Sequence, residues 1–511
     1  MQLMAYKNNC LLAQTDVNVE RSDPCVEQTV RTFAASIVHG IRRLLLCTFL
    51  LASWPASADF IAVGHPGINY SGHLYLLGVP GASGTVADNS GAFNQDFVIG
   101  ASGVVELAVP VSQFLAPDDT VLNKALQVTS ASPITGYFLN QAAFSSDMTH
   151  LLDLSALGTE YRVLTWDWSA SGGYPMQMSI TAVADGTTVN ITPTVALDSG
   201  QSANTAFNVA LNAGESVIYH VYNPWADLSG SLITSNNPVA VFSGSMSAFV
   251  PNSAVAADHL FAQMPPINHW STEYVVPETA RTGGAGNVVR ILAATNNTQV
   301  QVNGVTVVLN AGDFHQIVGS HDLHVLADNP VLVGQFLQGH EVTNPGDRMG
   351  DPAFTIIPGT DKLLDDYMFA APTGAPAFGE NYLSLAVPTA ELSSLTLNGA
   401  VVNVSGFLPV GTTGYSAGTV LVAPGAGRIQ ANAPFVVTLM GVSEMESYLT
   451  ILGASYSPGA SADPDHVPPP VPAPSPTADI VSVPWGGPLG WFVLVLSVLG
   501  LGGVRLARRG S

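Results

Sequence analysis

Asn236-Asn237-Pro238-Val239-Ala240-Val241-Phe242 sets the architecture of this 511-residue chain, because its order of polar turn, proline and apolar strand occurs four times. The other copies contain Pro133, Pro330 and Pro434, and successive prolines are 105, 92 and 104 residues apart. A period near one hundred residues is that of a whole module, since solenoid repeats are only about 20–50 residues long. We expect each proline to begin its strand, where its missing N–H does least harm.

A second repeat precedes these strands. Leu211-Asn-Ala-Gly-Glu215 recurs 98 residues later as Leu309-Asn-Ala-Gly-Asp313. Alternating residues such as Val189-Asn-Ile191 and Val300-Gln-Val302 have the period of half-buried strands, and Asp-Gly or Asn-Gly pairs indicate hairpin turns. The sequence therefore predicts an all-β fold of tandem β-sandwich-like modules, with about four internal repeats. A single large β assembly, in which the copies close on one another, is the open alternative.

Composition excludes two classes of protein. Hydrophobic residues make up 47% of the chain and charged residues 10%, which excludes a disordered chain. The net charge is −22, and no basic stripe is present, so no nucleic-acid partner is expected. The three cysteines, at positions 10, 25 and 47, all lie within the first 58 residues, where a leader with a signal peptide cleaved after Ala56-Ser57-Ala58 is predicted below. The mature chain would then have no disulfide.

The first 58 residues have the pattern of a leader. Arg42-Arg43 is followed by the apolar run Leu44–Trp54 and then by Ala56-Ser57-Ala58. This order of charged, apolar and small residues predicts a secretory signal peptide over about 38–58, within a leader of residues 1–58.

The C-terminal end has three parts. A proline-rich linker at 463–484 precedes an apolar segment at 485–504 and a basic tail at 505–511. The apolar segment has the length and flanking residues of a transmembrane helix, which makes a membrane an expected partner. The whole end resembles the C-terminal sorting signals of Gram-negative bacteria, although Val483-Pro484-Trp485 departs from their usual proline motifs. The sequence leaves open whether this tail is retained or cleaved.

Between the ends, we expect an N-terminal β module at 59–160 and a β region with three repeats at 161–462. Several segments of the second region carry a family resemblance: Ser229–Ser231, Pro238–Gly244, Ala257–Leu260, Gln263–Pro266, Trp270, Tyr274–Pro277, Asp351–Ala353 and Glu446–Tyr448. In this order they resemble the N-terminal domain family of IgG-Fc-binding proteins, which also occurs in bacterial surface proteins. The resemblance implies a secreted or surface-displayed binding domain, without implying immunoglobulin as the ligand.

Asp258, His259 and Trp270 are the candidate ligand-binding residues, because an aromatic side chain beside polar groups is a common anchor composition. The alternative is structural: an aspartate or histidine closes a turn, and the tryptophan fills a core.

Three patterns suggest enzyme or metal chemistry, and each has a simpler interpretation. Ser416 lies in a Gly-x-Ser-x-Gly pattern, but a strand and a proline follow it where a nucleophile elbow needs a helix. His315, His321 and His324 lack a zinc motif and are expected to be exposed loop residues. Asp365-Asp366 lacks a calcium-loop pattern and is expected in a solvated turn. We therefore expect no enzyme, cofactor or metal.

These observations predict an exported bacterial cell-surface binding or adhesion protein, anchored by its C-terminal hydrophobic segment. Its partner would be an extracellular protein or glycan. A structural component of the envelope or extracellular matrix is the alternative, and a serine hydrolase is the third possibility.

Overall fold

The structure, a computed structural model, describes residues 58–67, 70–115, 119–167, 173–223, 225–374 and 377–456. The predicted leader up to residue 57, the proline-rich linker, the apolar segment at 485–504 and the basic tail lie outside these residues. Within the described ranges, no helix combines the length and the apolar character that a membrane crossing requires. All the described residues belong to one compact unit that begins at Ala58.

The described residues form four copies of one strand pattern, which we call modules 1 to 4. Module 1 contains β1 (Ala58–Ala62), β2 (Ser71–Gly78), β3 (Ser83–Ala87), β4 (Asn94–Val98), β5 (Val104–Val109), β6 (Leu126–Ser130), β7 (Ile134–Ala142) and β8 (Ser145–His150). Module 2 contains β9 (Gly158–Arg162), β10 (Met176–Ala182), β11 (Thr187–Thr192), β12 (Phe207–Leu211), β13 (Ser216–Val221), β14 (Leu232–Phe249) and β15 (Ala257–Gln263).

Modules 3 and 4 continue the pattern. Module 3 contains β16 (Ser271–Val276), β17 (Asn287–Ala293), β18 (Thr298–Val302), β19 (Val305–Leu309), β20 (Phe314–Ser320), β21 (Leu323–Phe336) and β22 (Phe354–Ile357). Module 4 contains β23 (Leu364–Ala371), β24 (Glu380–Pro388), β25 (Thr396–Leu397), β26 (Ala400–Val401), β27 (Leu408–Pro409), β28 (Tyr415–Val422), β29 (Gly425–Ser443) and β30 (Glu446–Ile451). The short helices are η1 (Val111–Gln113), η2 (Leu154–Ala156), η3 (Ile267–His269), α2 (His340–Thr343), η4 (Thr360–Lys362) and η5 (Thr389–Ser394).

Modules 2 and 3 have the same sheet topology. The strand order is β12-β11-β14-β10-β13 in module 2 and β19-β18-β21-β17-β20 in module 3, and the first and last strands of each module pair with the long strand β14 or β21. Module 4 repeats this order with one additional strand, β27. In module 1 the long strand is divided into β6 and β7, so the module forms two four-stranded sheets. The prediction of an all-β fold is confirmed.

The repeated prolines do not all begin their strands. Pro133 directly precedes β7, as predicted, but Pro238, Pro330 and Pro434 lie inside β14, β21 and β29. Around each of these three prolines the pairing register shifts, so no ladder N–H is needed at that position. The expectation of a strand start is therefore wrong for modules 2 to 4, where the proline marks an irregularity at which one long strand changes its partners.

Neighbouring modules share their cores. On β2, Leu74 and Leu76 belong to a core that includes Phe242 of module 2, whereas Tyr75 and Leu77 on the other face belong to a core with module 4. Other cores join module 2 to module 3 and module 3 to module 4. The copies therefore pack as one assembly, which is the alternative that the sequence left open.

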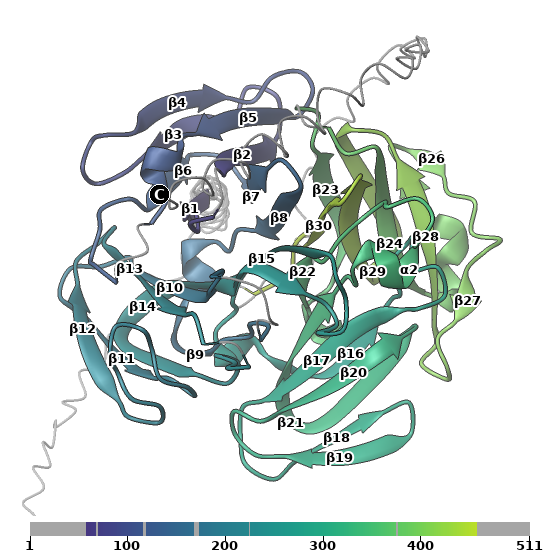
Figure 1. Ribbon diagram of the computed structural model, residues 1–511. Helices are drawn as coiled ribbons and strands as arrows, with labels where there is room; N and C mark the ends of the chain where they lie inside the picture. The colour runs from purple at the N-terminus through teal and green to yellow at the C-terminus, as the bar shows by residue number, and fades with distance from the viewer. Residues whose placement is uncertain are drawn as a thin grey trace, which may run out of the picture. The chain divides into compact units, whose positions relative to one another are not determined.

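The last strands of the four modules, β8, β15, β22 and β30, lie at the centre of the arrangement in Figure 1. We call them the inner strands. They contact one another in a closed cycle, from β8 to β15 to β22 to β30 and back to β8. Because of this central position, residues of all four modules meet at the inner strands and at the connections that lead into them.

Candidate functional site

A single carboxylate joins the four inner strands. Asp147 of β8 accepts backbone N–H bonds from Met148 and Leu449 on Oδ1, at 2.9 and 3.1 Å. Its Oδ2 accepts from Phe261 and Phe354, both at 2.9 Å. These four donors come from four different modules, and the side chain of Asp147 is fully buried. Asp147 therefore supplies the polar link at the centre of the assembly.

Asp258 of β15 forms a second link. Its donors lie on the inner strands, each two residues before a donor to Asp147. It accepts N–H bonds from Ser146 and His259 on Oδ1, at 2.8 and 2.6 Å, and from Ser447 on Oδ2 at 3.3 Å. The corresponding residue of the remaining inner strand, two before the Phe354 donor, is Pro352, which has no N–H. Asp258 therefore accepts a hydrogen bond from each of the three equivalent residues that have a backbone N–H.

Burial raises the pKa of both carboxyl groups well above the usual range. The negative charges of Asp351 and Glu446 raise the pKa of Asp258 further, whereas the backbone N–H donors act in the opposite direction at both residues. Because the surrounding backbone groups all donate, the arrangement accommodates acceptor oxygens. These two aspartates have the environment of structural groups.

The candidate residues predicted from the sequence are all buried. Asp258 and His259 have no exposed surface, and Trp270 is 5% exposed. The Trp270 indole donates to the Pro265 carbonyl at 3.1 Å and belongs to the core between modules 2 and 3. The structure brings Asp258 and His259 together at the start of β15, but Trp270 follows the other end of that strand, beyond η3. A ligand-binding role for these three residues stays a prediction.

The connections that lead into the inner strands lie together at one end of the assembly, because Asp258 binds the starts of three of these strands. We call this the loop end; it comprises residues 143–144, 250–256, 337–353 and 444–445. Two large apolar side chains are exposed there: Phe144, at 55%, and Val255, at 79%. Phe144 also has a left-handed backbone conformation, with φ of +63°. Loops held on a rigid scaffold in this way are common binding surfaces.

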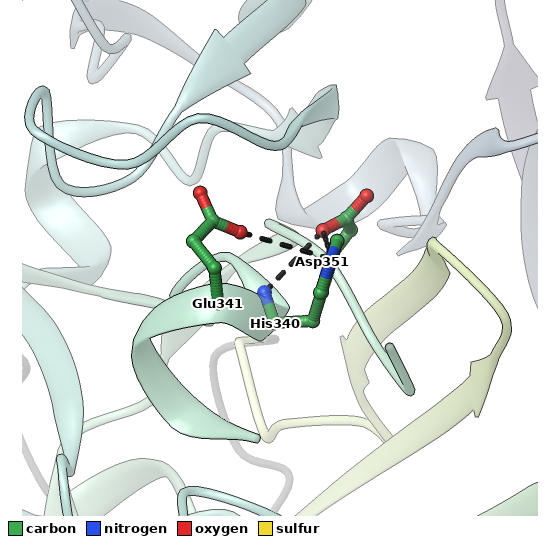
Figure 2. A group of neighbouring side chains, drawn as sticks. All are labelled: His340, Glu341 and Asp351. Carbon is green, nitrogen blue, oxygen red and sulfur yellow. Dashed lines mark hydrogen bonds and ion pairs between the residues drawn. The ribbon is translucent and has the colours of Figure 1, made fainter. Parts of the chain in front are cut away.

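His340, Glu341 and Asp351 form a compact group in the third of these connections (Figure 2). His340 and Glu341 belong to the single turn of α2, and the imidazole Nδ1 of His340 is 2.9 Å from Asp351 Oδ1 and 3.8 Å from Glu341 Oε2. Burial raises the pKa of Asp351. Among the described residues, this is the group of histidine and acidic side chains whose geometry fits a metal ion.

The loop end is connected internally. The Glu341 carboxylate accepts the backbone N–H groups of Val255 and Ala256, which ties the third connection to the second. Arg348 forms an ion pair with Glu444 at 3.2 Å, which ties the third connection to the fourth. The loop end is therefore cross-linked by polar contacts between modules.

The other sequence candidates lie in strands or surface pairs. Ser416 is buried in β28, and its hydroxyl bonds to that of Thr389 at 2.9 Å. His321 and His324 pair with Glu278 and Glu273. His315, in β20, is partly buried, and the three histidines do not form a common metal group.

The paired carboxylates are placed differently from expectation. Asp365 and Asp366 lie in β23 instead of a solvated turn, and Asp366 makes a two-point ion pair with Arg428. The strand pairing of β23 with β29 brings this arginine alongside, which no local turn pattern could have indicated.

Sequence reasoning missed Asp147 and the group at His340. Asp147 stands in Ser-Ser-Asp-Met, which resembles an ordinary turn, and only the meeting of four strands gives it a role. The Gly-His-Glu at 339–341 offered a weak signal. It lies in a long connection after the third repeated strand, whereas the strands of the first and fourth copies are followed by two-residue turns.

The chain is similar to known proteins over its central region. Residues 147–441 match the family described as IgGFc binding protein, which confirms the resemblance seen in the sequence. The IgGFc-binding protein of Homo sapiens is 26% identical over 299 residues, which cover 55% of this chain and 5% of that protein. The native form of E. coli alpha-2-macroglobulin aligns at 10% identity over 78% of this chain and 32% of its own, with a TM-score of 0.14.

Proposed function

Because the chain belongs to the IgGFc binding protein family, we propose that it is an exported cell-surface protein that binds an extracellular protein or glycan. The observation that carries this proposal is the family match itself, which extends over more than half of the chain. The human relative is named for binding IgG Fc, and this chain spans only about 5% of that relative. IgG Fc is therefore one ligand to test among several.

We place the binding surface at the loop end. Phe144 and Val255 supply exposed apolar area, and the hydrogen bonds from the Val255 and Ala256 N–H groups to the Glu341 carboxylate hold the second connection in place. Pre-organised apolar side chains lose little entropy on binding, which makes them effective anchors. In this proposal Asp258 and His259 support the surface from beneath, and Trp270 stabilises the core between modules 2 and 3.

Display at the surface would use the ends of the chain. The proposed signal peptide at about 38–58 would direct export, and the apolar segment at 485–504 with its basic tail would anchor the protein in a bacterial envelope. The proline-rich linker would then separate the modules from the membrane.

A structural role in the envelope or matrix is the second candidate, and β19 favours it. This strand ends the module 3 sheet, and it exposes Val305 and Val308 at 66% and 63%. An uncovered apolar edge strand is a template for pairing with another copy of the chain. Ordered self-association in the absence of any ligand would support this alternative.

The test is binding of the purified protein to immobilised IgG Fc, matrix proteins and mucin glycans at several salt concentrations. We expect saturable binding to one ligand class and a loss of about tenfold or more in the double variant Phe144→Asn, Val255→Ser. The matched control is Val401→Ser, which removes a valine of similar exposure (74%) from β26 in module 4.

Asparagine is chosen at position 144 because it tolerates the left-handed backbone conformation found there. Unchanged binding by the double variant would contradict the location of the surface. The absence of saturable binding to every ligand class, together with ordered assembly in sedimentation, would favour the structural role.

A further inference from the structure

We propose that His340, Glu341 and Asp351 bind a divalent transition-metal ion of the Zn²⁺ class at the loop end. The three donor atoms lie within 4.8 Å of one another. Ligand atoms around a tetrahedral Zn²⁺ are about 3.4 Å apart, given bond lengths near 2.1 Å. The observed separations of 2.9 Å between His340 and Asp351 and 3.8 Å between His340 and Glu341 lie on either side of this value.

The Glu341 carboxylate is oriented for this role. Its Oε1 is held by the backbone N–H groups of Val255 and Ala256, the latter at 2.6 Å. The other oxygen, Oε2, is buried and has no hydrogen-bond partner, while it faces the imidazole of His340. A buried carboxylate oxygen without a donor is costly, and a bound cation removes that cost. This unpartnered atom is evidence for a ligand independent of the clustering.

Asp351 is also fixed from outside the group. It is 3% exposed, and its backbone N–H donates to the Ser447 hydroxyl of module 4 at 2.8 Å. The backbone N–H of His340 donates to Asp351 Oδ1 at 3.4 Å. Groups that orient ligands in this way are a regular feature of metal sites, since they reduce the entropy lost when the ion binds.

The charge balance points in the same direction. Asp258 and Glu446 are near enough to interact electrostatically with each other, and Asp351 acts on Asp258 in the same way. Among the described residues, no lysine or arginine forms an ion pair with Glu341 or Asp351. A divalent cation would supply the missing positive charge at this partly buried position.

The donor set distinguishes among cations. Ca²⁺ and Mg²⁺ prefer oxygen ligands alone, whereas an imidazole nitrogen with two carboxylates suits Zn²⁺ and similar ions. Three protein ligands leave at least one coordination position for water or another ligand. Since α2 and Asp351 belong to the connection tied to residues 255–256, the ion would stiffen the loop end.

The test uses the untagged full chain, first dialysed against a chelator and then titrated with Zn²⁺ by calorimetry. We expect one saturable site, and a Co²⁺-loaded sample with the visible absorption of a low-coordinate ion. Glu341→Gln and His340→Gln should each weaken Zn²⁺ binding by about tenfold or more, whereas Ca²⁺ and Mg²⁺ should not compete.

The matched control is His321→Gln, which breaks a similar pair of histidine Nδ1 and glutamate oxygen, 2.8 Å apart, on the surface of module 3. This variant should bind Zn²⁺ as the wild type does. The proposal is overturned if no saturable binding occurs, or if Glu341→Gln and His340→Gln bind as tightly as the wild type while circular dichroism shows them folded. It does not depend on the proposed ligand-binding function, because Zn²⁺ affinity is measured directly.

Discussion

Asp147 accepts one backbone N–H from each of the four modules, so its carboxylate is a direct polar link among them. In Asp147→Asn, one oxygen becomes an NH₂ group that faces two N–H donors. We expect the free energy of unfolding to fall by about 2–5 kcal/mol, because two buried donors lose their acceptor. Urea denaturation measures this loss. Asp96→Asn in β4, which changes an exposed carboxylate, should leave the midpoint in place; equal midpoints for the two variants would refute the assigned role.

His259 makes stability depend on pH. Burial lowers its pKa to about 4, and its Nε2 accepts an N–H from the Asn140 side chain at 3.0 Å. An unfolded histidine titrates near pH 6.5, so between about pH 6.5 and 4 the unfolded state binds a proton that the folded state does not. The stability provided by the neutral imidazole is therefore lost as pH falls through this window, by up to about 3 kcal/mol.

Asp147 and Asp258 act in the opposite direction, because their raised pKa values make the folded state bind protons first. Both carboxylates are present in the wild type and in His259→Gln, so their contribution to the pH dependence of stability cancels when the two proteins are compared. On going from pH 7.5 to 4.5, the wild type should lose more stability in urea than the variant does. Parallel pH profiles for the two proteins would show that His259 is not neutral in the folded state.

At the scale of elements, one tyrosine fixes the first strand of each of modules 2 to 4. The hydroxyl of Tyr367 accepts the N–H of Leu364 and donates to the carbonyl of Phe435, both at 2.8 Å. Tyr161 and Tyr274 make the same two contacts in their own modules. In each case the hydroxyl bonds the N–H three residues earlier and ties β9, β16 or β23 to the long strand of its module.

Removing this hydroxyl leaves a buried donor and a buried acceptor unpaired. We expect Tyr367→Phe and Tyr161→Phe each to lower the unfolding free energy by about 1–3 kcal/mol. Tyr222→Phe, at a partly exposed tyrosine in the connection after β13, is the control and should have no comparable effect. The measurement is again the urea midpoint, and variants as stable as the control would mean that water satisfies the freed groups.

The sequence predicted elements well where a local pattern repeats. The strands that follow or contain the four repeated prolines, and the Asn-Gly hairpins β18–β19 and β25–β26, follow from periodicity and turn chemistry, which are local properties. The Asp185-Gly186 pair is not a hairpin turn, because the strands that it joins, β10 and β11, both pair with β14 and not with each other. The position of Pro238 inside β14 was not predictable in the same way, because it depends on which strands pair on either side of the proline. The tyrosines at 161, 274 and 367 were present as a repeat, and comparing the modules from their first strands would have revealed them.

The candidate site depended on contacts between distant residues. Glu341 meets Val255 and Ala256 across 85 or 86 positions, and Asp147 meets Leu449 across 302. No periodicity in one sequence encodes such pairings. The burial of Asp258 and Trp270 was the alternative that the sequence already offered, since both residue types also close turns and fill cores.

At the scale of the whole molecule, module 4 closes on module 1. Tyr456 and Ala454, which follow β30, belong to the core of module 1 together with Phe60 of β1. The Ser455 N–H donates to the Lys362 carbonyl, and the ring of Tyr456 packs on His269 with centroids 5.2 Å apart. Phe60 and Tyr456 also line one cavity. The two ends of the described chain therefore meet at the same junction.

This closure predicts that a circular permutant will fold. In the other junctions, the inner strand ends seven or eight residues before the next module begins, whereas Tyr456 follows the end of β30 by five. A linker of about two residues from Tyr456 to Ala58 would restore the interval, and new ends at Asn303-Gly304, the β18–β19 turn, would disturb no inner strand. We expect a permutant with the wild-type circular dichroism spectrum and a melting temperature within a few degrees of the wild-type value.

Tyr456→Ala should lower the melting temperature of both the wild type and the permutant, because it removes a buried aromatic side chain from the junction. A permutant that remains unfolded, or a Tyr456→Ala variant as stable as its parent, would mean that modules 1 and 4 are joined only loosely.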